Sequence, residues 1–164
     1  SLTVISAGTG TIALGGDGSI TSNIKDAATG KEATFQTNAD GTFTEAKDGA
    51  NVTTNTVNAQ GNTNKVTDGT NTSTATQTAT SIGGVITHGT VELAKAELNK
   101  DGFTVKQDGK TDVKIAGGDV TVTNNENGAT QKVQLSKLGS LNNLDGELKA
   151  RDEYQNNRRR RRER

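Results

Sequence analysis

The sequence predicts a mainly β fold built from antiparallel hairpins, and two observations support this. Short runs with alternating apolar residues lie at 33–37, 103–106, 113–115, 120–123 and 132–135. Pairs that favour the left-handed conformations of tight hairpin turns separate such runs. These pairs are Asp17-Gly18, Asp40-Gly41, Asp48-Gly49, Asp68-Gly69, Asp101-Gly102, Asp108-Gly109 and Asn127-Gly128, and Gly30 and Gly61 fill two of the gaps. One-faced strands separated by turns every 8–12 residues or so are typical of antiparallel sheets.

The composition predicts a folded domain with a meagre core. Only 30 of the 164 residues are Leu, Ile, Val or Phe, while a formal net charge of zero argues against disorder. So little apolar material argues against a large buried catalytic pocket. The absence of Cys excludes disulfides and thiolate metal sites. We therefore expect no enzymatic activity, no cofactor and no bound metal.

The stretch from 51 to 80 differs from the rest of the chain. It contains eleven Thr and six Asn but only three large apolar residues, Val52, Val57 and Val66. Thr favours exposed strands, yet little of this stretch could be buried. We interpret it as a solvent-facing sheet edge or a mobile polar excursion. A glycan-bearing surface is the alternative, because accessible hydroxyl groups are abundant.

Two helices are predicted. The segment from about 90 to 99 is rich in helix formers, with Thr90 as a candidate N-cap and Asp101-Gly102 after its end. A C-terminal amphipathic helix at about 141–155 is predicted from Leu141, Leu144 and Leu148, which follow the i, i+3, i+7 spacing of one helical stripe. We take this stripe as an interface, because such a stripe needs a partner surface.

The chain thus divides into a β-rich region, 1–138, and a helical segment with an arginine-rich tail, 139–164. Whether the first region contains two subdomains stays open. Residues 151–164 carry seven Arg against three acidic residues, so the remaining body has a balance of −4. No run is long and apolar enough for a transmembrane helix, and no signal-peptide pattern is present. Because the first residue is Ser, we expect a processed product or an excised fragment.

Each candidate for site chemistry has a simpler interpretation. His88 is the only histidine and has no nominated partner, so we interpret it as a turn residue. Gly8, Gly10 and the Gly15-Gly16 pair lack the spacing of a phosphate-binding loop. Gly15–Gly18 and Gly117–Asp119 match single units of a calcium-binding nonapeptide repeat, which binds only when stacked in many copies.

The run Arg158–Arg162 could bind phosphates. However, the sequence shows no basic face beside this run and no aromatic residues interleaved with it. We therefore interpret it as a solvated tail and expect neither nucleic acid nor a membrane as partner. Attachment to either, and an ordered interface role, are the alternatives.

The leucine stripe with its charges is Leu141-x-x-Leu144-Asp145-x-x-Leu148-x-x-x-Asp152. It resembles the segment where bacterial flagellins return from their variable outer domains into the inner coiled-coil core. Arg151 occupies the place of an apolar residue in that family, and the arginine run replaces the expected continuation. The segment 91–98 is similar to a short helix of enteric flagellin outer domains, and the Thr/Asn/Gly/Asp-rich body is similar to their variable region.

This resemblance implies a structural subunit region of the bacterial flagellar filament: extracellular, surface-exposed, antigenically variable and partnered by other flagellin subunits. The alternative function is a trimeric adhesin or phage tail-fibre segment that binds a cell surface. That alternative predicts a sedimentation mass three times the mass of the chain.

Overall fold

The structure is a computed structural model that describes residues 2–107 and 109–163, without the side chains of 140–144. The described residues form fourteen β-strands, one 3-10 helix and one α-helix. The strands are β1 (Thr3–Ala7), β2 (Gly10–Leu14), β3 (Ile20–Lys25), β4 (Glu32–Asn38), β5 (Gly41–Asp48), β6 (Asn51–Asn58), β7 (Gly61–Thr67), β8 (Asn71–Thr78), β9 (Ser81–His88), β10 (Val91–Asn99), β11 (Gly102–Lys106), β12 (Thr111–Ala116), β13 (Asp119–Asn124) and β14 (Thr130–Gln134). The helices are η1 (Leu135–Lys137) and α1 (Leu138–Arg162).

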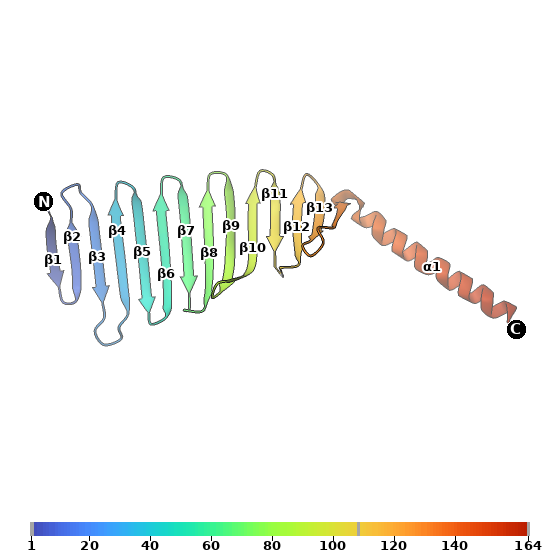
Figure 1. Ribbon diagram of the computed structural model, residues 1–164, viewed down its shortest axis with the longest axis horizontal. Coiled ribbons are helices and arrows are strands. Elements are labelled where there is room, and N and C mark those ends of the chain that lie inside the picture. The colour runs from blue at the N-terminus through green and yellow to red at the C-terminus, as the bar shows by residue number, and fades with distance from the viewer. Residues whose placement is uncertain (1, 108, 164) are drawn as a thin grey trace.

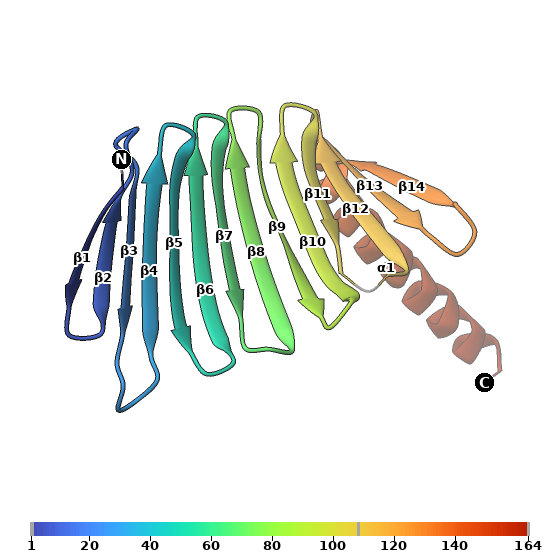
Figure 2. The ribbon, with the colours of Figure 1, turned by 60° about the vertical axis from the view of Figure 1, so that its left-hand side comes forward.

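Each strand pairs with the next one in the sequence, and every pair is antiparallel. The strand order across the sheet is therefore β1 to β14 without a crossover. Figures 1 and 2 show the result: one long, gently twisted sheet that is a single layer thick, from which α1 extends beyond the last strands. The predicted mainly β, antiparallel fold is confirmed.

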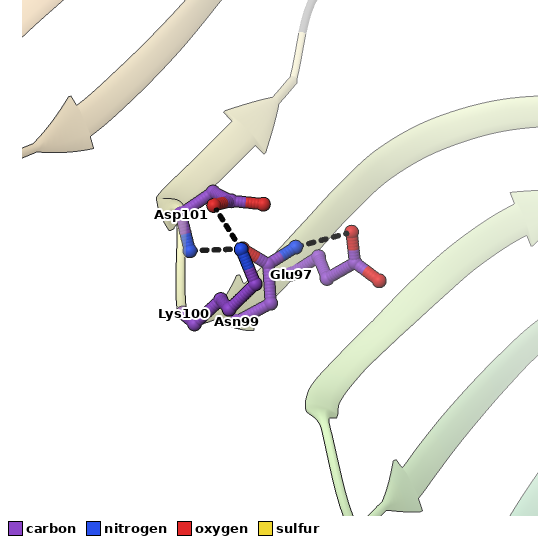
Figure 3. A network of polar contacts seen from close by, with 4 residues as sticks. All are labelled: Glu97, Asn99, Lys100 and Asp101. Atoms are coloured by element: carbon purple, nitrogen blue, oxygen red, sulfur yellow. Dashed lines mark hydrogen bonds and ion pairs between the residues drawn. The ribbon is translucent and has the colours of Figure 1, made fainter.

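The turns lie where the glycine pairs predict them. Gly18, Gly41, Gly49, Gly69, Gly102 and Gly128 all have positive φ, as do Gly30 and Gly61. Gly109 also has positive φ, while Asp108 of the same predicted pair lies outside the described residues. Most turns are closed by the short polar side chain that precedes them. In the β10–β11 turn, for example, Asn99 Oδ1 accepts the backbone N–H of Asp101 at 2.9 Å (Figure 3).

No residue with a described side chain is buried, so the sheet has no hydrophobic core. The composition predicted a small hydrophobic core, but the described part of the chain has none. Backbone hydrogen bonds between strands and side-chain pairs across them must hold the sheet together, since each good pair contributes about 0.2–1 kcal/mol.

The helix predicted at about 90–99 is wrong: these residues form β10. Helix propensity is high here, but Ala94-Lys95-Ala96-Glu97-Leu98 also alternates with period two, and β9 and β11 pair with this segment on both sides. Tertiary pairing therefore overrides a weak local preference. A bulge between Glu92 and Ala94 interrupts the alternation and hides it from the sequence.

The stretch from 51 to 80 is neither a sheet edge nor an irregular excursion. It forms β6, β7 and β8 in the middle of the sheet, with a neighbouring strand on each side. In a single-layer sheet a strand needs no buried side chains, so Thr and Asn suffice once the backbone groups are paired.

The C-terminal helix is present and longer than predicted, because it begins at Leu138 and continues to Arg162. A Lys149–Asp145 ion pair of 3.0 Å bridges successive turns, and arginines occupy the last turn, where positive charge complements the helix dipole. The helix is exposed along residues 145–163.

Candidate interaction surfaces

The strand register divides the side chains of the sheet between two faces. Residues paired across neighbouring strands lie on one face, and successive residues of a strand alternate between faces. Three rows of residues paired across the strands share a face. The first row contains the pair Thr3 and Leu14, the second contains Ile5 and Ile12, and the third contains Ala33 and Ala46. Followed from β1 to β14 among the described residues, these rows contain no charged side chain. We call this the apolar face and the opposite one the polar face.

The polar face carries the charges of the strands except Asp48, which ends β5 at the margin of the apolar face and lies 3.8 Å from Lys31. Ion pairs on it join Lys47 to Glu45 at 3.5 Å, Lys106 to Asp112 at 3.2 Å and Lys132 to Asp119 at 3.1 Å. Such exposed pairs contribute little stability, about 0–1 kcal/mol each. At the centre of this face, threonines surround Lys65 on β6, β7 and β8: Thr54, Thr56, Thr63, Thr67, Thr72, Thr74 and Thr76. The arrangement gives a hydrated face, and a glycan on its hydroxyls stays a prediction.

Large aliphatic and aromatic side chains gather at the two ends of the apolar face. The N-terminal patch is Ile5, Ile12, Leu14, Ile20, Ile24 and Phe35. The C-terminal patch is Ile82, Ile86, Leu98, Phe103, Val105, Val113, Ile115, Val120, Val122 and Val133. Several large apolar residues depart from this partition: Val4, Phe43, Val52 and Val85 lie on the polar face, Val57 and Val66 lie between the two patches, and Leu93 lies at the bulge of β10.

Between the two patches the apolar face is crossed by side-chain amides. Asn55 pairs with Asn64, and Asn62 pairs with Gln77, on strands β6 to β8. We call these four residues the amide band. The Oδ1 atom of Asn55 is shielded from solvent and accepts no hydrogen bond from the described residues. The amide band is thus uncharged but not fully satisfied within one chain.

The apolar face is uncovered. Ile82 and Ile86 of β9 are 52% and 47% exposed, whereas Val85 and Thr87, which alternate with them on the polar face, are half-buried. The face is also ridged. Ala33 and Ala46 lie between Ile24 and Val66 and line an open groove of about 590 Å³, whose lining also includes the charged residues Asp26, Lys31, Glu32, Lys47 and Asp48. Apolar side chains therefore stand in solvent beside furrows made by small residues.

The helix α1 is a second candidate surface. Leu148 is 48% exposed, while the side chains of Leu141 and Leu144 lie outside the described residues, so the interface stripe stays a prediction. The guanidinium carbon of Arg158 lies 5.9 Å from the centroid of the Tyr154 ring, which fits a weak cation–π contact. The arginine run forms the last part of α1, and its residues are exposed.

His88 ends β9, and its Nδ1 lies 2.8 Å from Oδ1 of Asn71 in β8, where it has a structural role next to a turn. The residues that the structure describes contain no group of three or more metal-ligating His, Cys, Asp or Glu side chains. In the same residues, no helix has the length and apolar character needed to cross a membrane.

Three carboxylates with lowered pKa values accept hydrogen bonds within turns. Backbone N–H groups of Asn71 and Thr70 lower the pKa of Asp68, and those of Ala28 and Thr29 lower the pKa of Asp26. The pKa of Asp17 is lowered by hydrogen bonds from the hydroxyl and backbone N–H of Ser19. All three carboxylates lie in exposed loops, where they stabilise the turn.

Sequence reasoning found the leucine stripe but missed the apolar face. The alternation within single strands was visible, yet the register that aligns fourteen strands was not. Once the turn glycines are fixed, pairing outward from the turn at Gly102 would have placed Leu98 opposite Phe103, but the bulge between Glu92 and Ala94 hides the alignment of this pair with Ile82.

These features define a class: an extended, single-layer antiparallel β protein with one apolar face, one polar face and a protruding helix. Comparison of the chain with protein-family models, with curated proteins and with solved structures gives no match.

Proposed function

We propose that the chain is a structural protein, the surface-exposed variable region of a bacterial flagellin together with the start of its C-terminal inner helix. The observation that carries this proposal is the junction of sheet and helix. The meander ends at Gln134, and after the single turn of η1 the chain continues as the 25-residue helix α1. The leucine stripe and Asp145 lie in this helix, at the place where flagellins return to their core.

Two further features support a structural role. The grooves that we find on the sheet are shallow and open, and the perturbed carboxylates serve turns. The polar face presents a Thr- and Lys-rich hydrated surface that tolerates sequence change, because no described side chain on it is buried. In this role the chain is extracellular, and its helix contacts other flagellin subunits.

The segment 91–98 does not support the flagellin proposal, because it lies in the strand β10 and does not form the short helix of enteric flagellins. The proposal therefore rests on the stripe, its position after the meander, and the composition of the body.

Immunolabelling tests the proposal. Antibodies raised against the purified chain are expected to decorate flagellar filaments along their whole length on cells that produce it. Deletion of the gene is expected to remove both the label and swimming. Labelling of non-flagellar surface fibres in swimming cells would instead support the adhesin alternative, and an absence of any surface label would refute a filament role.

A further inference from the structure

We infer that two copies of this chain pack face to face through their apolar faces, forming a two-layered homodimer. The inference concerns the sheet and does not depend on the flagellin proposal, which rests on the helix. It starts from the amount of surface that a single chain exposes.

The chain exposes far more surface than a compact protein of its size. Its accessible surface is 12228 Å², whereas a compact monomer of 17.0 kDa exposes about 7,700 Å². The protruding helix and elongated sheet account for this excess, and in the described residues only the sheet has a largely apolar face, whose three rows carry no charge. Folded proteins rarely leave such an extended apolar face in water.

The dimensions of the sheet fit a stable pair. Strands lie about 4.8 Å apart and rise about 3.4 Å per residue, so fourteen strands of about six residues give a face of about 1,300 Å². Covering this face on both partners buries at least about 2,600 Å², which is in the range of obligate homodimers. Two such layers would also supply the hydrophobic core that one chain lacks.

The chemistry of the face favours a second copy over another kind of partner. The three rows carry no charge, so the rows of two identical faces meet without repulsion, even though the body around them has a balance of −4. The amide band is self-complementary, because Asn and Gln side chains each donate and accept hydrogen bonds. An amide band fits a second amide band better than a lipid surface, which cannot satisfy it.

The relief of the face is also suited to a copy of itself. Ala75, Gly84 and Ala96 form a row of small residues flanked by Ile82 and Leu98 on one side and Ile86 on the other. Ridges of large side chains and furrows of small ones on one sheet can interdigitate with those of another, as in sandwiches of two sheets. The same alternation on both partners satisfies the self-complementarity that a two-fold interface requires.

Light scattering and sedimentation of the full chain test the inference. We expect a mass of twice 17.0 kDa. A mass of one chain from micromolar to millimolar concentration would overturn it, as would a trimer. A monomer that floats with phosphatidylcholine vesicles would overturn it in favour of a lipid partner.

Two neighbouring residues of β13 provide a matched pair of variants. Val122 lies on the apolar face and Thr121 on the polar face, and both are half-buried. We expect Val122→Lys to halve the mass and Thr121→Lys to leave it unchanged, with the β circular dichroism of both retained. An unchanged mass for both variants would place the contact elsewhere and refute the inference.

Cross-linking keeps the inference testable if Val122→Lys fails to fold. The chain has no cysteine, so single substitutions can be labelled cleanly. In either two-fold arrangement of the sheets, the central strand β7 lies over the centre of its partner. Asn64→Cys, on the apolar face, is expected to be joined by a short bis-maleimide on the order of tenfold faster than Thr63→Cys, on the polar face. Equal rates would contradict pairing through the apolar face.

Discussion

Asp68 and Asn71 are joined twice across the turn between β7 and β8. The Oδ1 atom of Asp68 accepts the backbone N–H of Asn71 at 2.7 Å, and its Oδ2 atom accepts the side-chain amide of Asn71 at 3.2 Å. The Oδ1 atom of Asn71 in turn lies 2.8 Å from Nδ1 of His88 in β9. One carboxylate thus orders a turn and connects it to the next strand.

The first prediction concerns acid. Because its hydrogen bonds lower the pKa of folded Asp68 from the ordinary value of 3.8, the ionised carboxylate stabilises the folded state. That stabilisation is fully present above pH 3.8 and is lost as the pH falls through the lowered pKa. We expect Asp68→Asn to reduce the melting temperature at neutral pH and to weaken its dependence on pH in this acidic window.

Asp40→Asn is the matched control for that experiment. Asp40 also precedes a turn glycine, but its carboxylate accepts no hydrogen bond that we observe among the described residues. Thermal melts of both variants between neutral pH and about pH 2 provide the measurement. Equal pH dependence of the two variants would show that Asp68 has no special role.

The second prediction compares two turn glycines. At Gly61, φ is +157° and a Cβ atom would lie 2.1 Å from the carbonyl oxygen of Gln77, on the neighbouring strand. At Gly49, φ is +59° and a Cβ atom would meet nothing within 4 Å. We expect Gly49→Ala to cost about 1 kcal/mol of unfolding free energy for its left-handed backbone. Gly61→Ala should cost clearly more, about 2–4 kcal/mol, because β7 must also move away from β8. Urea titrations of both variants measure the difference.

These turns show how much of the fold the sequence could predict. Asp-Gly and Asn-Gly pairs constrain the local backbone, so the turns and the strands at 103–106 and 120–123 follow directly. The segment 91–99 could not be assigned correctly, because its preference for a strand comes from pairing with β9 and β11 rather than from its own residues. The bare sheet could not be foreseen either, since alternation indicates which side chains share a face but not whether anything covers it.

The third prediction concerns the amide band. Asn55 and Asn64 face each other among apolar rows, and Oδ1 of Asn55 has no hydrogen-bond partner in the described part of the chain. Replacing both by Val removes this unpaired acceptor and adds a β-branched pair. At concentrations low enough for the chain to be monomeric, where no second amide band covers the first, we expect the double variant to gain about 1–2 kcal/mol in unfolding free energy, measured by denaturant titration. The control Thr54→Val on the polar face should change it by less than about 0.5 kcal/mol. A loss of stability in the double variant would show that the amides are paired in solution.

The fourth prediction compares the local stability of two internal blocks of strands. Strands β6–β8 and β11–β13 both have neighbours on each side, so edge effects are similar. Cross-strand pairs in the first block are mostly Thr and Asn, while the second block pairs Val105 with Val113 and Val113 with Val122. Because apolar β-branched pairs contribute more, we expect backbone amides in 51–80 to exchange faster than those of β11–β13. Slower exchange in 51–80 would indicate that strand length outweighs side-chain pairing.

The last prediction separates the helix from the sheet. The helix α1 extends away from the last strands (Figure 1). Leu148 on this helix is 48% exposed. Burial of three leucines would contribute roughly 1.5–3 kcal/mol each, but ordering the backbone costs about 1–2 kcal/mol per residue, and Gly146 adds about 1 kcal/mol. The helix should therefore fray in the isolated chain and become ordered when a partner covers the stripe.

We expect Leu144→Asp with Leu148→Asp to leave the melting temperature of the sheet unchanged and to abolish assembly through this segment. Circular dichroism follows the sheet, and sedimentation with flagellin subunits follows assembly. If the double variant unfolds the whole chain, the leucines stabilise the sheet itself, and the proposed return into a filament core loses its main support.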